Sequence, residues 1–182
     1  YNFAQQGITS LPEGTYNFTY DQIGRMLTKT GVNSGAYSYQ YVTAANGRQQ
    51  LLSITGPNVL TEFKYDNLGR TIEEKETLTT SGNKVLKSNF TYNKYGQLVD
   101  HTYPGGFVTT NEYDGLGYLR KIKNGNTVVW QLNGMAAPGL INQFTYNNGQ
   151  ISNNLGYDNN LNLSQINYGN FLQQTYAISP KN

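Results

Sequence analysis

Phe18-Thr19-Tyr20-Asp21-Gln22-Ile23-Gly24-Arg25-Met26-Leu27 is the stretch that decides the fold of this chain. It returns almost unchanged as Phe63-Lys64-Tyr65-Asp66-Asn67-Leu68-Gly69-Arg70-Thr71-Ile72. Two blocks this similar within 182 residues indicate an internal repeat. A repeated unit of this size cannot bury its apolar side chains alone, so its stability depends on neighbouring copies.

The repeated block predicts a β-hairpin. Phe18 and Tyr20 are two residues apart, so on a strand both side chains point to the same face. Asp21 suits the first position of a type I turn, where its side chain accepts hydrogen bonds from nearby backbone N–H groups. Gly24 falls where the turn needs a left-handed residue, a conformation that costs a residue with a Cβ about 1–2 kcal/mol.

Weaker copies of the block follow along the chain. Tyr65, Tyr92 and Tyr113 recur at a fairly even spacing, as the units of a repeat array do. A degenerate copy, Tyr41 followed by Asn46-Gly47-Arg48, fits between the two best copies. The residues predicted to build the repeat are Tyr20, Asp21, Gly24, Arg25, Tyr65, Asp66, Gly69, Arg70, Tyr92, Gly96, Tyr113, Asp114, Gly117, Tyr146, Gly149, Tyr157 and Asp158.

Two copies lack a glycine at the expected place. In the copy that contains Tyr146, Asn148-Gly149 comes one residue early, which predicts a two-residue type I′ turn. After Asp158, Leu161 occupies the glycine position, so we predict Asn160 as the left-handed residue.

One interval does not fit the period. The spacing from Tyr113 to Tyr146 is not a clean multiple of the others, which indicates an irregular insertion near residues 133–139, with Met135-Ala136-Ala137-Pro138-Gly139 as its loop. No linker divides the chain, so residues 1–182 are predicted to form a single domain.

A second class of turn alternates with the first. Gly56-Pro57-Asn58, Pro104-Gly105-Gly106 and Asn124-Gly125-Asn126 are examples, and strand-like runs separate them from the motif turns. The alternation predicts an all-β fold: an antiparallel meander of hairpin repeats in a curved or spiralling sheet, up to a partial shell. Strands at the two ends of such an array leave open edges, which favour pairing with another chain, including a homodimer.

Composition excludes several function classes. Charged residues make up 13% of the chain and the net charge is +2, too little to indicate nucleic acid binding. The chain has no cysteine, which excludes disulfides and thiol nucleophiles. No apolar run approaches the roughly 18 residues of a membrane-spanning helix, so membrane insertion is not expected.

The block Tyr-Asp-x-x-Gly-Arg followed by Leu or Ile resembles the RHS/YD-repeat family. That family includes bacterial RHS polymorphic toxins, wall-associated surface proteins, shell subunits of insecticidal toxin complexes and teneurins. The resemblance implies a hairpin ribbon that spirals into a hollow shell, in a secreted or cell-surface protein of bacterial origin. The chain lacks the repeated Asp-Pro-x-Gly signature and any effector domain, so it resembles a segment of a longer array.

Candidate chemistry is weak by comparison. Four of the five aspartates occupy the motif turn, and no pair of the remaining acids is marked as catalytic. His101 is the only histidine, and Asp100 beside it points to the opposite face of a regular strand. Arg25 and Arg70 are expected to lie over tyrosine rings rather than to bind a ligand.

The function expected from these residues is therefore structural. We predict a non-catalytic scaffold or shell segment without cofactor or metal, whose partners are other repeats or domains of the same longer protein or a cell-surface molecule. The alternative is a carbohydrate-binding or adhesion module that uses the aromatic, Asn-rich sheet faces, with Trp130 as the candidate sugar-stacking residue.

Overall fold

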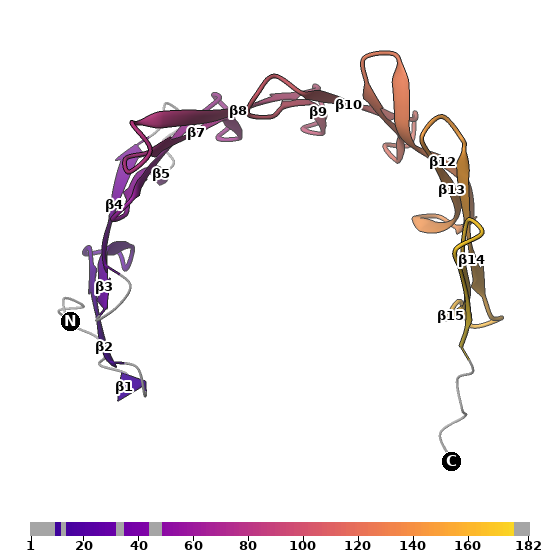
Figure 1. The fold of residues 1–182 in the computed structure, drawn as a ribbon, viewed down its shortest axis with the longest axis horizontal. Coiled ribbons are helices and arrows are strands. Elements are labelled where there is room, and N and C mark those ends of the chain that lie inside the picture. The colour runs from indigo at the N-terminus through magenta and orange to yellow at the C-terminus, as the bar shows by residue number, and fades with distance from the viewer. Residues whose placement is uncertain (1–9, 12–13, 32–34, 44–48, 177–182) are drawn as a thin grey trace. The chain divides into compact units, whose positions relative to one another are not determined.

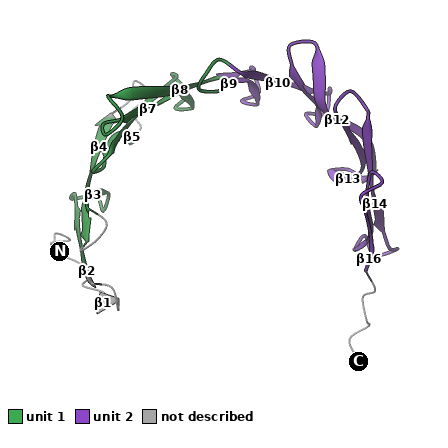
Figure 2. Cartoon of the chain, in the orientation of Figure 1, with its two compact units in different colours: residues 1–90, 103–106 green, residues 91–102, 107–182 purple. Residues whose placement is uncertain are grey.

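A computed structural model of the chain describes residues 10–11, 14–31, 35–43 and 49–176. All regular elements in these ranges are β-strands (Figure 1). The chain divides into two compact units, residues 1–90 with 103–106 and residues 91–102 with 107–182 (Figure 2). The single domain expected over residues 1–182 stays a prediction.

Unit 1 is an antiparallel meander in which the hydrogen-bonded order of the strands is their order in the chain. Its strands are β1 (Ser10–Leu11), β2 (Gly14–Tyr20), β3 (Met26–Gly31), β4 (Gly35–Thr43), β5 (Gln49–Thr55), β6 (Val59–Tyr65), β7 (Thr71–Leu78) and β8 (Lys84–Tyr92), whose last two residues belong to unit 2.

Unit 2 has the same topology. Its strands are β9 (Leu98–Thr102), β10 (Val108–Tyr113), β11 (Leu119–Asn124), β12 (Thr127–Ala137), β13 (Leu140–Tyr146), β14 (Ile151–Tyr157), β15 (Leu163–Tyr168) and β16 (Leu172–Thr175). The predicted all-β antiparallel meander is confirmed.

The motif tyrosine marks a break in the strand pairing. In the hairpins β2–β3, β4–β5, β6–β7, β10–β11 and β14–β15 the register shifts by one residue between the tyrosine and the residue before it. The returning strand therefore carries one extra residue, which is a β-bulge. A bulge increases the local twist, so each copy of the motif bends the sheet at the same place in the repeat.

The segment predicted as an insertion loop is a strand. Residues 133–137 continue β12, and only Pro138 and Gly139 turn the chain into β13. The pairing of β12 with β13 has three register shifts around Gly134 and Met135. These shifts accommodate residues that do not fit the pattern of a regular strand. The prediction of a loop there is wrong because bulges keep an irregular sequence hydrogen-bonded to its neighbour.

Very few side chains of the described residues are buried. Leu132, 4% exposed, is the one buried hydrophobic residue among them, and the buried polar residues are Ser53, Thr61 and Asn153. A domain normally packs two layers of secondary structure around a shared core. The described strands supply one layer, so the stability of the sheet rests on bonds and contacts between neighbouring hairpins.

Candidate functional site

The two best copies of the motif form identical turns. Asp21 Oδ1 accepts hydrogen bonds from the backbone N–H groups of Ile23 at 3.0 Å and Arg25 at 2.9 Å. Asp21 Oδ2 accepts from Arg25 Nε at 2.6 Å. In the second copy Asp66 receives the same three bonds, from the backbone of Leu68 and Arg70 and from Arg70 Nε. Each aspartate therefore uses both carboxylate oxygens within its own turn.

Glycine closes each of these turns in the left-handed conformation. Gly24 has φ of 84° and Gly69 has φ of 82°, and each donates its N–H to the carbonyl of the motif aspartate. Gly96 and Gly117 have the same conformation in the later copies. The glycines are thus used for their backbone freedom, as the turn prediction requires.

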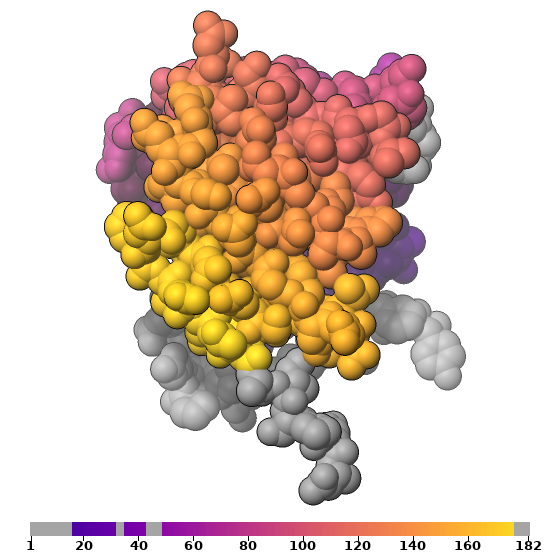
Figure 3. Space-filling view, turned by 90° about the vertical axis from the view of Figure 1, so that its right-hand side faces the viewer, coloured from indigo at the N-terminus to yellow at the C-terminus, as the bar shows by residue number. Residues whose placement is uncertain are grey.

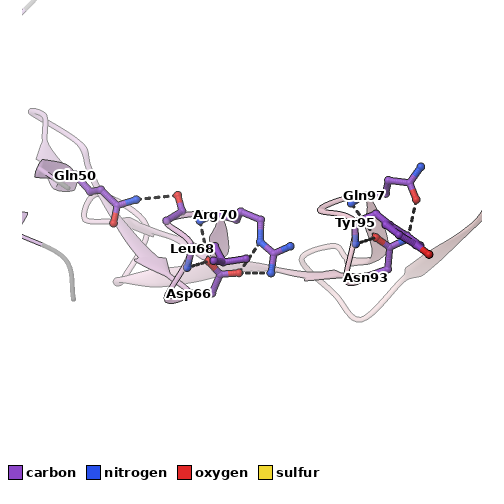
Figure 4. A network of polar contacts seen from close by, with 8 residues as sticks. Gln50, Asp66, Leu68, Arg70, Asn93, Tyr95 and Gln97 are labelled. Atoms are coloured by element: carbon purple, nitrogen blue, oxygen red, sulfur yellow. Dashed lines mark hydrogen bonds and ion pairs between the residues drawn. The ribbon is translucent and has the colours of Figure 1, made fainter. Parts of the chain in front are cut away.

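The weaker copies keep the bonding pattern with other side chains. Asn93 Oδ1 accepts from the N–H groups of Tyr95 and Gln97, and its Nδ2 donates to Gln97 Oε1 at 2.8 Å (Figure 4). Asp158 accepts from the backbone of Asn160 and Asn162, and from Asn162 Nδ2 at 3.1 Å. The first turn residue therefore pairs with the fifth in the same geometry, although the charges differ between copies.

The copy at Asp114 is built slightly differently. Asp114 Oδ1 accepts from the N–H groups of Leu116 and Tyr118, both at 3.0 Å. Its cationic partner is Arg120, two residues further along, with Nε 3.8 Å from Asp114 Oδ2. The fifth residue is a tyrosine here, so the arginine of the following strand takes over the role.

Side chains near the fifth turn position reach the neighbouring copy. Arg25 Nη1 donates to Gln49 Oε1, and Arg25 lies 4.3 Å from the centre of the Tyr41 ring. Gln50 Nε2 donates to the carbonyl of Gly69 at 2.8 Å (Figure 4). In unit 2 Gln97 Nε2 donates to the carbonyl of Gly117 at 2.9 Å. The predicted stacking of arginine on tyrosine is thus observed for Arg25. Arg25 also forms an ion pair with Asp21 of its own turn, which the sequence did not suggest.

The motif tyrosines form a second link between copies, which the sequence did not reveal. Four tyrosine hydroxyls each donate to a backbone carbonyl on the preceding strand, 14 to 16 residues earlier in the chain. We call these bonds tyrosine clamps: Tyr41 to Met26 at 3.0 Å, Tyr65 to Leu51 at 2.7 Å, Tyr113 to Leu98 at 2.8 Å and Tyr157 to Ile141 at 2.7 Å. These bonds depend on the strand register and on the β-bulge, so they cannot be predicted from the local sequence.

The clamp of Tyr157 identifies a copy that the sequence concealed. Its acceptor Ile141 lies two residues after Gly139, as Leu98 lies two residues after Gly96. Gly139 is left-handed with φ of 80°, and in the sequence it lies midway between Gly117 and Leu161. The turn at Pro138-Gly139 is therefore a shortened motif turn.

The copy assigned to Tyr146 and Gly149 is out of phase. In a meander successive turns alternate between the two ends of the strands, and the turn after β13 falls opposite those after β10, β12 and β14. It spans four residues, 147–150, with Asn147, Asn148 and Gly149 all left-handed, so the prediction of a two-residue turn is wrong. The irregular interval from Tyr113 to Tyr146 is explained because it joins turns on opposite sides.

The last copy corrects another prediction. Leu161, not Asn160, is the left-handed residue, with φ of 62°. The bonds from Asn160 and Asn162 to Asp158 fix the turn so firmly that leucine occupies the position elsewhere held by glycine. The Asn46-Gly47-Arg48 turn of the degenerate copy lies outside the described residues.

The remaining acids among the described residues are largely engaged in cross-strand ion pairs. Glu62 pairs with Lys75 at 2.5 Å, and Glu112 pairs with Lys123 at 2.9 Å. Glu73 lies between Lys64 at 2.9 Å and Lys87 at 2.6 Å. The described residues hold no group of three or more acids or histidines that could bind a metal ion.

Asp100 and His101 do not form a catalytic pair. Asp100 accepts hydrogen bonds from the hydroxyls of Thr91 at 2.9 Å and Thr110 at 2.7 Å, on the strands to either side. His101 is directly opposite Thr109 and is next to Asp100 on β9, so the two side chains point to opposite faces. Asp100 therefore serves as a cross-strand acceptor.

Trp130 belongs to an aromatic cluster on one face of unit 2. Its ring centre lies 6.3 Å from that of Phe144, which contacts Tyr146 at 5.6 Å and Tyr168 at 6.4 Å. The hydroxyl oxygens of Tyr168 and Tyr146 are hydrogen-bonded at 3.3 Å, and the pKa of Tyr146 is raised by this bond to Tyr168 and by partial burial. Trp130 is thus half-buried against other rings, and its role in stacking on a sugar stays a prediction.

The turn geometry shifts the titration of the motif aspartates. For Asp66 the backbone N–H of Arg70 is the largest cause that lowers the pKa, and the Arg70 guanidinium adds to it. For Asp21 burial acts to raise the pKa, but the hydrogen bonds from Arg25 and Ile23 outweigh it and hold the pKa below 3.8. The pKa of Asp158 is lowered in the same way by Asn162.

Acid should remove the stability that these aspartates provide. Because the folded pKa of Asp66 is below its ordinary 3.8, its contribution is present above that value and is lost as the pH falls through the folded pKa. Asp66→Asn should be less stable than the natural chain at about pH 7, and the difference should disappear at about pH 2. Urea unfolding at both pH values measures this; a difference independent of pH would contradict it.

No family model matches the chain, and no curated protein matches it. Among solved structures, the chain superimposes on part of a chain in the crystal structure of TcdB2-TccC3-Cdc42 with a TM-score of 0.56, 15% identity and 88% of its own length covered. The resemblance to the YD-repeat fold is confirmed.

Two further structures give the same result. The crystal structure of TcdB2-TccC3 matches with a TM-score of 0.57 and 15% identity, and the Tc holotoxin pore of Photorhabdus luminescens with a TM-score of 0.56 and 14% identity. Both matches cover 88% of this chain. The chain spans about a tenth of the length of the chains it matches, 10% to 11%. At this level of identity the likeness concerns the fold.

The described part of the chain contains no helix long and apolar enough to cross a membrane.

Proposed function

We propose that this chain is a non-catalytic structural segment of a longer, secreted YD-repeat protein, in which its sheet is a length of scaffold or of an encapsulating shell wall. The single observation that carries the proposal is the set of tyrosine clamps, which tie four of the motif hairpins to the preceding one. A sheet built this way gains length by adding hairpins. It needs no closed core of its own.

The chemistry of the motif supports the same role. Asp21, Arg25, Asp66 and Arg70 satisfy one another inside the turns. The one-layer sheet leaves both faces for contact with other parts of a larger protein, which is what a wall requires. The similarity to segments of toxin-complex chains is consistent with a shell-type role in a secreted protein, where the partners are other repeats of the same polypeptide.

The test uses the longer parent protein. Deletion of the hairpins within residues 92–157, which keeps the register of the flanking repeats, should open the wall. An added protease should then cleave the polypeptide that the remaining repeats enclose. A control deletion that removes a whole domain outside the repeat array should leave that polypeptide protected. Equal protease sensitivity of the two deletion proteins would overturn the proposal.

Carbohydrate binding is the alternative, and one observation favours it. Four amide side chains, Gln143, Asn154, Asn167 and Gln173, lie directly opposite one another across four strands of unit 2. Such a row can hydrogen-bond the hydroxyls of a neutral sugar. Calorimetric titration with a panel of glycans tests it, with Trp130→Ala as the variant that separates stacking from amide contacts; an absence of heat for every glycan would exclude it.

A further inference from the structure

The most exposed hydrophobic side chains recur at one position of the repeat. Among the described residues, the five most exposed large hydrophobic side chains are 63% to 85% exposed. Phe171 is one of them, and the other four are each the third residue of a motif turn, directly before its glycine: Ile23, Leu68, Tyr95 and Leu116. We call these four the tip residues. Exposed hydrophobic residues that are scattered singly need no explanation, but recurrence at one place in a repeat indicates a shared role.

The motif turns of each unit follow one long side of its ribbon of strands. They come after alternate strands of the meander, so they lie at the same end of the strands. Figure 3 shows β12–β14 of unit 2, in orange, and β15–β16, in yellow, as one continuous surface. Because neighbouring strands are about 4.8 Å apart, successive motif turns recur roughly every 10 Å. In unit 2 the row runs from Tyr95 through Leu116 to Pro138, which is also exposed.

Hydrogen bonds hold this row in place before any partner binds. Gln97 Nε2 donates to the carbonyl of Gly117 at 2.9 Å, which joins the turn of Tyr95 to the turn of Leu116. Within each turn the motif asparagine or aspartate accepts the backbone N–H of the tip residue itself, at 2.9 Å for Tyr95 and 3.0 Å for Leu116. Apolar groups on a backbone that is already ordered lose little conformational entropy on binding, so the row is suited to contact a partner.

The other long side of unit 2 has a complementary form. The turns after β11 and β13 carry Gly125 and Gly149, which are left-handed with φ of 55° and 85°. A Cβ built on either glycine has no atom within 4 Å, so these turns present backbone with free space around it. They recur at the same two-strand interval as the motif turns, and Phe171 in the turn after β15 is the exception on this side. A row of tips from one ribbon therefore matches this side of another ribbon.

A one-layer ribbon is too narrow to form a broad wall alone. Its width is the length of a strand, which for β10 and β11 is six residues, or roughly 20 Å at about 3.4 Å per residue. Additional hairpins lengthen the ribbon and leave this width unchanged. The chain spans 10% to 11% of the chains it matches, and a protein of that length has many further hairpins that can lie alongside. A broad wall therefore needs contacts between the long sides of different stretches.

We propose that the tip residues pack against the glycine-containing turns of a second stretch of hairpin ribbon in the same longer protein. We call this the lateral contact. It joins two different sides of the ribbon, and such a heterologous contact can repeat from one stretch to the next, so that stretches add up to a wall. A partner with the same repeat matches every tip in the row. The inference rests on the proposed shell-wall function and names the contact that would give the wall its breadth.

Site-specific photo-cross-linking in the longer parent protein tests the identity of the partner. The photoreactive residue p-benzoylphenylalanine replaces Leu116 in one variant and Asn154 in a control variant. The probe at Leu116 should cross-link to a turn of another stretch of hairpins, identified by mass spectrometry. Asn154 is exposed in the middle of β14, away from both long sides, and should give no such cross-link. A probe at Leu116 that cross-links to the enclosed polypeptide, to a separate protein or to nothing would overturn the inference.

Two double variants test whether the lateral contact closes the wall. Tyr95→Ser with Leu116→Ser should leave the thermal unfolding of the isolated chain nearly unchanged, because these side chains are 76% and 85% exposed there. In the parent protein the same change should raise the rate of protease cleavage of the enclosed polypeptide roughly tenfold, since two apolar contacts are lost. Lys94→Ser with Gly115→Ser changes the preceding residues of the same two turns and should leave this rate unchanged. Equal cleavage rates for the two double variants would contradict the lateral contact.

The outcomes separate this inference from the proposed function. A parent protein that protects its enclosed polypeptide, but gives no cross-link from Leu116 to another stretch, keeps the shell role and overturns the lateral contact. A parent protein that protects nothing overturns the shell role, whereas a cross-link between stretches still supports the lateral contact. Flotation of the isolated chain with phosphatidylcholine vesicles, abolished by Tyr95→Ser with Leu116→Ser, would assign the tips to a lipid surface and overturn the inference.

Discussion

Gly117→Val is expected to lower the free energy of unfolding by about 2–3 kcal/mol. Gly117 has φ of 86°, a conformation in which a β-branched residue is strained. A Cβ there would also lie 3.2 Å from Gln97 Nε2, the group that donates to the Gly117 carbonyl. The substitution therefore strains the turn and disturbs the link to the preceding motif turn. Urea unfolding followed by circular dichroism measures the loss.

The same turn provides the control. Gly115 precedes Gly117 by two residues, has ordinary backbone geometry, and a Cβ built on it has no atom within 4 Å. Gly115→Val should change stability by less than about 0.5 kcal/mol. The reverse change, Leu161→Gly, should stabilise the last copy by up to about 1 kcal/mol, since it relieves a left-handed leucine. Equal losses for Gly115→Val and Gly117→Val would refute the turn geometry.

Asn153→Val is expected to raise the free energy of unfolding by about 1–3 kcal/mol. Asn153 is 0% exposed, and neither its Nδ2 nor its Oδ1 has a hydrogen-bond partner among the described residues. It lies directly opposite Phe144 on β13 and Tyr168 on β15, and these two rings contact each other at 6.4 Å. Valine suits both the strand and this apolar surrounding, and it removes the cost of burying an amide without a partner.

The neighbouring asparagine separates this effect from strand propensity. Asn154 lies on the opposite face of β14, is exposed, and accepts a hydrogen bond from Gln143. Asn154→Val gains the same propensity for a strand but loses that bond, so its stability should change by less than about 0.5 kcal/mol. A similar gain in both variants would mean that propensity, rather than the buried amide, sets the effect.

The sequence predicts this fold well where local chemistry decides it. The aspartate and glycine of the motif specify the turn, and the alternation of the two turn classes specifies the antiparallel meander. Irregular strands were harder to predict from the sequence, because the bulges of β12 depend on its pairing with β13. Leu161 shows the same limit, since bonds to Asp158 override the preference of a leucine.

The functional interpretation changed most at the tyrosine and the arginine. From the sequence, Tyr65 and Tyr113 only fill a sheet face; in the structure their hydroxyls bind carbonyls of the preceding strand. Each of these hydrogen bonds joins residues that are further apart in the sequence than the length of one motif. The bonds therefore depend on the strand register and cannot be predicted from a single copy of the motif. Arg25 and Arg70, which the sequence predicted to lie over tyrosine rings, also form ion pairs with the aspartates of their own turns.

The central claim is that the motif exists to hold hairpins together, and the tyrosine clamps test it most directly. Urea unfolding of Tyr65→Phe, Tyr113→Phe and Tyr157→Phe should show a loss of about 1 kcal/mol in each variant, because each removes one hydroxyl donor and keeps the ring. Tyr95→Phe is the control, since Tyr95 is 76% exposed at a turn tip and makes no clamp. Losses confined to the three clamp variants support the account; stabilities equal to that of Tyr95→Phe would contradict it.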